Sequence, residues 1–491
     1  MVRRLASKHD RLRELQAGDL SVRASIASSY ESLPERPRRA FRLLALLGPA
    51  DFAEWVVGAL LGEPDAGDVT SELVSRSLLT PLSADATGEP RYRLHDLLRE
   101  YAAEDPDIES ASDKLEAVER LLAGWLQLAQ LAEDSLPPEP YFPPRAHELG
   151  TAVIPAKDAE RLTADPVSWF TTERINLLAA VEQACAAGWL EVARRLASSQ
   201  CAFQHIEDRH DDAERIWRMI AEWATRSEDR AAITHARLRV GASMVERGLA
   251  ADAFPVLDRC VGAAVEVDEP EAFALALYWR ASCAFDIGNV EQALADARRG
   301  IDVAHRAGSR FAELMNLRIL GSTLSWIGEA SEAIAAVEAA MSIATDLGVA
   351  AYELAVLHSL AFAYAHAEQY DRAASACMRK VELSRELGDV RGEAHAYGVL
   401  GDVYHRQGKY DLAVESLLRA LPVFRDHHAL RHQALCLEKL GCAYEQMAAY
   451  PHAISYLEES VTKFRELSLF SRADQAQQAL DRCRAAVASA S

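Results

Sequence analysis

The stretch EAHAYGVLGDVYHRQGKYDLAVESLLRALPVF, residues 393–424, contains the pattern that decides the fold. In its first half, Tyr397 and Leu400 belong to an apolar stripe at helical spacing, which predicts an amphipathic helix. Gly408 is suited to end this helix, and Asp411 is suited to begin the next one as its N-cap. A second apolar stripe follows Asp411, so the stretch predicts two helices joined by a tight turn.

The same pattern returns every 40 residues, starting at Gly241, over six units without a slip. One column of this alignment is always a small residue, and the column twelve positions later is always alanine. The alanines are Ala253, Ala293, Ala333, Ala373, Ala413 and Ala453. Small residues let two helices approach closely, and a helix pair cannot bury its apolar face alone. We therefore expect the units to stack into an all-α solenoid.

The repeat resembles the tetratricopeptide repeat (TPR), although its 40-residue period exceeds the usual 34. The residues that carry the resemblance are Tyr397, Leu400, Gly401, Tyr404, Ala413, Leu417 and Ala420. The resemblance implies a right-handed superhelix whose first helices line the concave face. Asp208 and Ala213 extend the frame by one unit upstream, and residues 471–490 look like a capping helix. Pro422 is expected to kink or shorten the end of its helix.

Residues 21–105 have a different character. Helical segments are followed by an expected strand, a turn near residues 86–90, a short strand at Arg91–Leu94 and a final helix. One of the expected helices covers residues 52–62, with Asp51 as a possible N-cap. Helices followed by a small β-hairpin are typical of a winged-helix domain.

This region is similar to the winged-helix part of bacterial STAND-type NTPases, close to regulators of the AfsR/SARP kind. The stretches that carry the resemblance are VRASIASSYESLPERPRRAFRLLALL, LVSRSLLTPL and RYRLHDLLREYA, with DPVSWFTTERINLLAAVEQA farther along. Leu94-His95-Asp96 stands where that family has its MHD tripeptide, so the resemblance implies that His95 and Asp96 sense bound ADP. The sequence has no GxxxxGK[ST] motif, and one histidine cannot replace a phosphate-binding loop. Autonomous ATP hydrolysis is therefore not expected.

The composition limits the possible functions. Lys plus Arg total 53 and Asp plus Glu total 74, and the net charge of −21 disfavours a polyanion-binding protein. The expected recognition helix, residues 68–80, contains Asp68 and Glu72 against the single Arg76. No apolar run approaches the roughly 18 residues of a membrane span, and no signal peptide is evident. The eight cysteines form no CxxC motif, which favours reduced thiols in the cytoplasm.

The first helices of the repeats provide the best candidate site. Family spacing places aromatic, histidine and charged residues together on the concave face, where interfaces enrich aromatic residues and arginine. These positions are Tyr278, Phe285, Arg318, Ser322, Trp326, His358, Phe362, His366, His395, Asp402, His405, Arg406, Glu438 and Glu445. Packing between neighbouring repeats is the alternative role for these rings. We predict a protein or peptide partner in this groove, with no cofactor, no metal and no catalytic residue.

The sequence thus predicts four parts: a remnant helical segment at 1–20, a winged-helix domain at 21–105, a connector at 106–170 and a TPR solenoid at 171–491. The connector is helical and proline-rich, and Tyr141 and Phe142 are expected to attach it to the solenoid. The leading hypothesis is a non-enzymatic, signal-sensing regulator that binds proteins through the groove and takes part in transcriptional regulation of the AfsR-like kind. An NTPase domain in trans is another possible partner. The alternatives are a transcriptional regulator that binds DNA through the winged helix, and an ADP-sensing arm that acts on an NTPase in trans.

Overall fold

The computed structural model describes residues 19–48, 50–103, 110–143, 152–427, 429–467 and 469–490. The chain divides into two compact units. The first unit contains Met1–Leu136 and Ala146–Gln200, and the second contains Pro137–Arg145 and Cys201–Ser491. The expected remnant segment at 1–20 lies outside the described residues except for its last two. The four-part division expected from the sequence stays a prediction.

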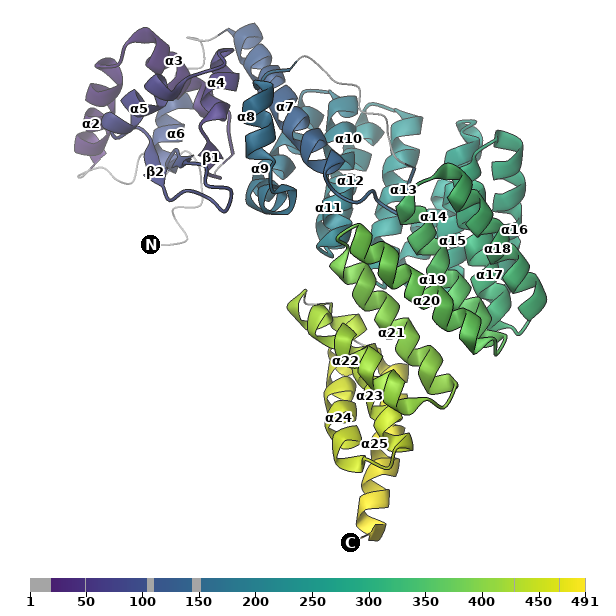
Figure 1. The fold of residues 1–491 in the computed structure, drawn as a ribbon. Coiled ribbons are helices and arrows are strands. Elements are labelled where there is room, and N and C mark those ends of the chain that lie inside the picture. The colour runs from purple at the N-terminus through teal and green to yellow at the C-terminus, as the bar shows by residue number, and fades with distance from the viewer. Residues whose placement is uncertain are drawn as a thin grey trace. The chain divides into compact units, whose positions relative to one another are not determined.

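The first unit combines helices with one small sheet (Figure 1). Its elements are α2 (Asp19–Glu31), α3 (Glu35–Leu44), β1 (Phe52–Ala53), α4 (Trp55–Leu61), α5 (Gly67–Ser75), β2 (Thr80–Leu82), β3 (Arg91–Arg93), α6 (Asp96–Ala103), α7 (Ala111–Asp134), α8 (Ala156–Leu162), α9 (Pro166–Ala186) and α10 (Leu190–Ser198). The three strands are antiparallel in the order β1-β3-β2. Tyr92 on the central strand pairs with Phe52 on one side and with Pro81 on the other.

The expected N-cap at Asp51 is wrong. The segment after Asp51 first pairs with β3 as a strand, so α4 begins only at Trp55, with Glu54 as its N-cap. Asp51 instead accepts a hydrogen bond from Nε of Arg91 at 3.0 Å. The buried Arg91 also donates to the buried carboxylate of Glu173 on α9, which ties the sheet to that helix within the first unit.

The second unit is a stack of helices (Figure 1). They are α11 (Cys201–Ile206), α12 (His210–Arg226), α13 (Arg230–Glu246), α14 (Ala250–Glu266), α15 (Pro270–Asp286), α16 (Val290–Ala307), α17 (Arg310–Trp326), α18 (Ala330–Leu347), α19 (Ala350–His366), α20 (Tyr370–Glu386), α21 (Val390–Arg406), α22 (Tyr410–Asp426), α23 (Leu430–Gln446), α24 (Tyr450–Glu466) and α25 (Phe470–Ala490). From α13 to α23, each odd-numbered helix contacts the next odd-numbered helix as well as its sequence neighbours. The odd-numbered helices therefore form one continuous layer, and they are the helices expected to line the concave face.

The turns between helices explain two differences from the expected helix ends. Gly408 has a φ of 76°, as a residue just past a helix end often does. The turn is so short that α22 begins at Tyr410 with Lys409 as its N-cap, so the expected N-cap at Asp411 is wrong. Asp411 instead lies in the first turn of α22, where its charge complements the helix dipole. Pro422 lies inside α22 and does not end it.

The column of small residues has a steric cause. A Cβ atom placed on Gly401 would lie 2.6 Å from Cγ of Leu417, the residue sixteen positions later. Gly241, Gly321 and Gly441 meet the residue sixteen positions later in the same way. Where the column contains alanine instead, as at Ala361, the residue sixteen positions later is smaller than leucine, as at Cys377. The repeat therefore keeps the combined volume of the two positions small.

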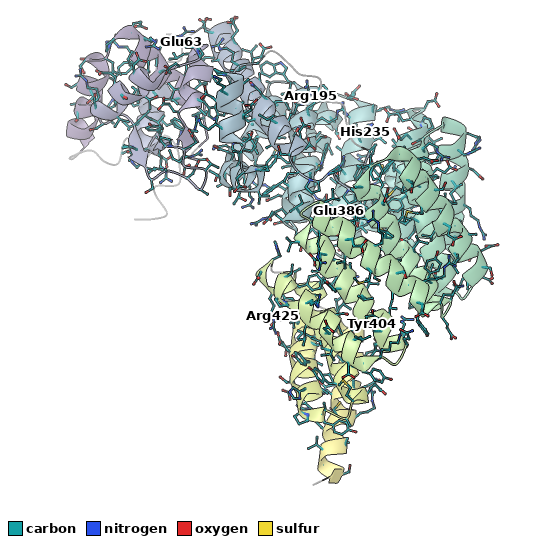
Figure 2. All side chains as sticks on the ribbon, in the orientation of Figure 1. Glu63, Arg195, His235, Glu386, Tyr404 and Arg425 are labelled. Carbon is teal, nitrogen blue, oxygen red and sulfur yellow. The ribbon has the colours of Figure 1, made fainter. Side chains whose placement is uncertain are left out.

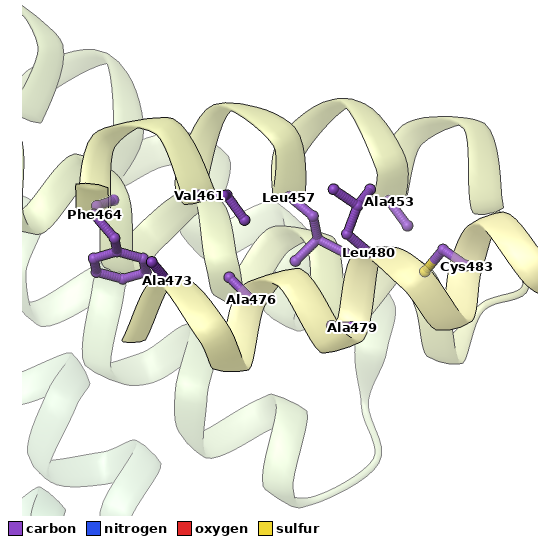
Figure 3. Packing of buried hydrophobic residues seen from close by; sticks show 10 residues of the cluster. Ala453, Leu457, Val461, Phe464, Ala473, Ala476, Ala479, Leu480 and Cys483 are labelled. Carbon is purple, nitrogen blue, oxygen red and sulfur yellow. The ribbon is translucent and has the colours of Figure 1, made fainter. Parts of the chain in front are cut away.

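The last helix covers the apolar face of the last repeat (Figure 3). Leu457 and Phe464 on α24 pack with Leu480 and Cys483 on α25, and all four side chains are buried. On the surface, Arg425 of α22, which is labelled in Figure 2, forms an ion pair at 2.8 Å with Glu459 of α24 and so links neighbouring repeats. Within the described ranges, no helix combines the length and apolar character needed to cross a membrane.

Candidate functional site

A cavity of about 290 Å³ lies among the helices of the second unit. Its wall combines helices that are far apart in the sequence, from α11 to α23. The charged and histidine residues that line it are His205, Asp208, His210, Glu246, Arg318, His358, Lys380, Asp389, Arg391, His395 and His432. Apolar side chains of α19, such as Leu354, complete one side. A cavity with convergent polar groups and an apolar wall is the usual form of a ligand site.

Arg391 links helix α21 to helix α11, and both helices contribute to the cavity wall. Its guanidinium donates hydrogen bonds to the backbone carbonyls of His205 at 2.9 Å and Ile206 at 2.7 Å. It also lies 3.6 Å from the carboxylate of Asp208. Helix α21 is thereby joined to α11, which precedes it by almost 200 residues.

The five histidines of the cavity are held in their neutral form. Burial lowers the pKa of His205 and of His358 to about 3, and that of His210 and of His432 to about 4. Burial also lowers the pKa of His395 well below its ordinary value. The rings of His395 and His432 meet edge to face with centroids 4.1 Å apart. At neutral pH these imidazoles offer both a donor and an acceptor to a ligand.

Lys380 differs from the other charged groups of the cavity in its lowered pKa and in its lack of a nearby ion-pair partner among the described residues. Burial lowers the pKa of its ammonium to about 8, although Asp389 acts in the opposite direction. Among the described residues, no carboxylate lies within ion-pair distance of Lys380. Its column in the repeat otherwise contains only small residues: Cys260, Gly300, Ala340, Ala420 and Ser460. A lysine in a column of small residues is a sequence signal that marks this position as exceptional.

A segment of the chain itself, Pro137–Pro143, packs on the same face of the second unit. The ring of Phe142 stacks on Trp279 with centroids 6.1 Å apart, and Tyr141 meets Trp279 edge to face at 5.8 Å. The guanidinium carbon of Arg239 lies 3.4 Å from the centroid of Phe142, and its Nη1 donates to Glu139 at 2.7 Å. These contacts confirm the expectation that Tyr141 and Phe142 attach the connector to the solenoid.

The same segment forms one edge of the cavity. Its residues Pro137, Pro138, Pro140 and Tyr141 line the cavity beside the histidines. Arg318 lies over the ring of Tyr141, with its guanidinium carbon 5.2 Å from the centroid. Tyr352 donates from its hydroxyl to the backbone carbonyl of Phe142 at 3.4 Å. The odd-numbered helices of the solenoid therefore hold a non-helical segment of the chain through aromatic, cationic and backbone contacts.

The structure divides the expected groove residues into three groups, and the first lies at the cavity. Arg318, His358 and His395 line it. Tyr278 is buried and accepts a hydrogen bond from Arg318, so it positions that arginine. Ser322 donates back to the carbonyl of Arg318 within α17. This group is the part of the expected site that the fold brings together with the cavity.

The second group forms an aromatic row. Trp326 lies between Phe285 and His366, with centroid distances of 6.3 and 6.4 Å. His366 also meets Phe362 at 4.1 Å. The side chain of Trp326 is 63% exposed, and it is the most accessible ring of the row. These residues join neighbouring repeats and present one exposed ring.

The third group is engaged in ion pairs between helices. Asp402 binds Arg406 and Lys439, each at 3.1 Å. Glu438 and Glu445 pair with arginines of α25 at 3.6 and 2.7 Å. The ring of His405 packs against Tyr410 with centroids 5.4 Å apart. These contacts stabilise the last repeats and do not involve the cavity.

His95 and Asp96 are exposed at the start of α6 in the first unit. Asp96 pairs with Arg99 at 2.9 Å. The acidic residues of α5 are also engaged, since Asp68 pairs with Arg36 at 2.5 Å and Glu72 pairs with Arg76. The proposed contact of His95 and Asp96 with ADP stays a prediction.

Comparisons with known proteins agree with the repeat fold. The tetratricopeptide repeat family matches residues 352–426. The chain is 34% identical over 197 residues to the regulatory protein AfsR of Streptomyces coelicolor, which covers 37% of this chain and 18% of that protein. It is 34% identical over 196 residues to AfsR of Streptomyces griseus, with 38% and 18% coverage. The aligned part of the chain thus spans less than a fifth of these relatives.

A solved structure supports the same architecture. A STAND protein with a tetratricopeptide repeat sensor from Pyrococcus horikoshii superposes with a TM-score of 0.59 at 16% identity. The match covers 92% of this chain and 60% of that one. At this level of identity the likeness shows the fold, which is an all-α, TPR-type solenoid preceded by a unit with a small sheet.

Proposed function

We propose that this chain is a non-enzymatic regulatory protein that binds an extended segment of a partner protein on the inner face of its solenoid. The observation that supports the proposal is the packing of Pro137–Pro143, because it displays how these helices hold a non-helical segment of chain. TPR solenoids bind peptides on such faces, and the similarity to AfsR supports a regulatory role.

The contacts of the seated segment define the chemistry of the partner. Glu139 neutralises the buried Arg239, and Phe142 fills the space between Arg239 and Trp279. A partner segment with an acidic residue followed by two aromatic residues fits the same contacts. Lys380 lies farther along the cavity without an ion-pair partner among the described residues, and it suits a further carboxylate of the partner.

A peptide-binding experiment tests the proposal directly. The probe is a labelled peptide of residues 136–144, LPPEPYFPP, titrated by fluorescence anisotropy. A full-length Tyr141→Ala/Phe142→Ala variant releases its own segment and is expected to bind the probe saturably. The unaltered chain is expected to bind it at least tenfold more weakly, because its own segment competes. Adding Arg239→Ala to the double variant is expected to remove binding.

A peptide in which the glutamate, tyrosine and phenylalanine are all alanine serves as the control probe. Circular dichroism and thermal unfolding establish that the variants stay folded. If the folded double variant binds neither probe, or binds both equally, the segment is only a structural element and the proposal fails.

A second experiment separates the cavity from the aromatic row. Affinity capture from source-cell lysate compares the unaltered chain with a Lys380→Met/His395→Ala variant and a Trp326→Ala variant. Loss of a specific partner only in the first variant supports the cavity. Loss only with Trp326→Ala places the interaction on the aromatic row and contradicts the proposed site.

A further inference from the structure

A compact group of potential metal ligands lies at one end of the cavity wall. His205 of α11, His210 of α12 and Glu246 of α13 each offer one ligand atom, and the three atoms lie within 4.8 Å of one another. Asp208, in the turn between α11 and α12, places Oδ1 3.4 Å from Nε2 of His210. Glu246 places Oε2 3.9 Å from the same nitrogen. Three helices therefore direct three donors to one point, and Asp208 adds a carboxylate beside His210 that also lies 3.6 Å from Arg391.

The spacing of these donors is close to that of a zinc site. Zinc bonds of about 2.0–2.1 Å in tetrahedral geometry hold the ligand atoms about 3.3 Å apart. The separation of 3.9 Å between Oε2 of Glu246 and Nε2 of His210 nearly satisfies this geometry. The widest separation, below 4.8 Å, must close by at most about 1.5 Å. Side-chain rotations of His205 and Glu246 supply such a movement without a shift of the helices.

The protonation states also suit a cation. Burial lowers the pKa of His205 to about 3 and that of His210 to about 4, so both imidazoles have a free lone pair at neutral pH. Burial raises the pKa of the Glu246 carboxyl to about 7. In the described part of the chain, no arginine or lysine lies within ion-pair distance of Glu246. A bound divalent ion would supply the compensating charge.

Two arginines lie near this position. Arg391 donates to the backbone carbonyls of His205 and Ile206 and lies 3.6 Å from Oδ1 of Asp208, and Arg318 donates to Tyr278. Tyr141 meets the ring of His205 edge to face with centroids 5.5 Å apart.

We propose that His205, His210 and Glu246 form a three-ligand binding site for a divalent transition-metal ion, with Zn²⁺ as the best-fitting member of that class and the fourth position left for water. Two imidazoles with a carboxylate favour zinc and similar ions over magnesium or calcium, which prefer all-oxygen ligands. The ion would join α11, α12 and α13 and fix the end of the cavity wall beside Tyr141. The proposal does not rest on the proposed partner binding, although its three ligands line the same cavity.

The test uses the full chain after treatment with a chelator. Zn²⁺ is titrated in competition with a chromophoric chelator, and Co²⁺ is added separately as a spectroscopic probe. One equivalent of Zn²⁺ is expected to bind and to raise the unfolding temperature. Bound Co²⁺ is expected to show visible d–d bands without the intense near-ultraviolet band of thiolate ligands, which excludes binding by the cysteines.

Matched variants decide the assignment. His210→Ala and Glu246→Gln are each expected to weaken Zn²⁺ binding at least 100-fold, whereas His358→Ala, a change in the same cavity outside the cluster, leaves it unchanged. His210→Asn is a second, milder variant if His210→Ala unfolds. Retention of the stoichiometric site in a folded His210→Asn/Glu246→Gln variant, or no binding to the unaltered chain, overturns the proposal.

Discussion

The guanidinium carbon of Arg239 lies 3.4 Å from the ring centroid of Phe142, while the same guanidinium binds the carboxylate of Glu139. Both side chains of the cation–π pair are less than a tenth exposed. One arginine of α13 therefore binds two residues of the Pro137–Pro143 segment at once. Arg239 thus attaches this segment to the solenoid together with Trp279, Arg318 and Tyr352.

Replacing Arg239 by alanine is expected to lower the free energy of unfolding by about 3 kcal/mol, because it leaves Glu139 unpaired and removes the cation from Phe142. Urea unfolding followed by circular dichroism measures the change. Arg259→Ala on the exposed face of α14 is the matched control, with an expected change below about 0.5 kcal/mol. Equal midpoints for the two variants would contradict the assigned role of Arg239.

The Gly401–Leu417 contact gives a second expectation. Gly401→Ala is expected to destabilise the chain by about 1–3 kcal/mol, since the new methyl group meets Leu417 and the Ala413 carbonyl. Combining it with Leu417→Ala is expected to cost less than the sum of the two single changes, because the smaller partner makes room. A double-mutant cycle from urea unfolding measures this coupling, and strict additivity would contradict the steric explanation.

The ammonium group of Lys380 is expected to lower the stability of the folded chain. Lys380→Met is expected to raise the free energy of unfolding by about 1 kcal/mol, because it removes a buried charge that lacks a carboxylate at ion-pair distance in the described chain. Lys439→Met is the control: Lys439 pairs with Asp402 at 3.1 Å, so its loss is expected to be neutral or slightly destabilising. Chemical unfolding of both variants at pH 7 compares the signs, and a destabilised Lys380→Met variant would show that this ammonium is satisfied in the fold.

Because the cavity histidines have lowered pKa values, we expect the folded chain to lose stability in mild acid. The folded pKa values of His205, His210, His358 and His432 lie at about 3 or 4, below the value of about 6.5 expected in the unfolded chain. Between pH 6.5 and 4 the unfolded chain therefore binds more protons, and the folded state is destabilised as the pH falls. His205, His210 and His432 each contribute up to about 1.4 kcal/mol per pH unit in that window, and the exposed His358 contributes less because solvent screens its charge.

Glu246 acts in the opposite direction. Its pKa of about 7 lies above the unfolded value of about 4.5, so its contribution to stability increases as the pH falls between these values. The contribution of Glu246 to stability offsets that of one of the four histidines, so the folded state still loses stability as the pH falls. Urea midpoints at pH 7.5 and pH 5.0 measure the effect, and His358→Gln/His432→Gln is expected to reduce it. A midpoint that does not decrease at pH 5.0 would argue against neutral, buried histidines.

Much of the solenoid was predictable because its signals are local. The 40-residue period arises from 17- and 18-residue helices joined by short turns, and positive φ values recur in these turns, as at Gly248, Gly288 and Gly408. The N-cap predicted at Asp411 is wrong because the turn before α22 is shorter than the capping preferences of its residues suggest, so Lys409 is the N-cap. The helix predicted to begin just after Asp51 begins instead at Trp55, because Phe52 and Ala53 pair with β3 as a strand.

The candidate site was predicted only in part. Arg318, His358 and His395 were found because they belong to first helices with aromatic and histidine columns. Lys380 was missed because it belongs to a second helix, although its column of small residues marks it as exceptional. His205 and His210 precede the regular repeats, so periodicity did not identify them. Their position in the site depends on contacts with α21.

The class of fold, the repeat length, the helix pairs and the residues that must stay small can be inferred from the amino-acid sequence alone, because they follow from short-range periodicity and close packing. Three features come from the folded chain: α21 contacts α11 through Arg391, Pro137–Pro143 packs against α13 and α15, and His205, His210 and Glu246 converge. The physical reason is that these contacts depend on the small rotation between repeats summed over the whole stack, which no local pattern encodes.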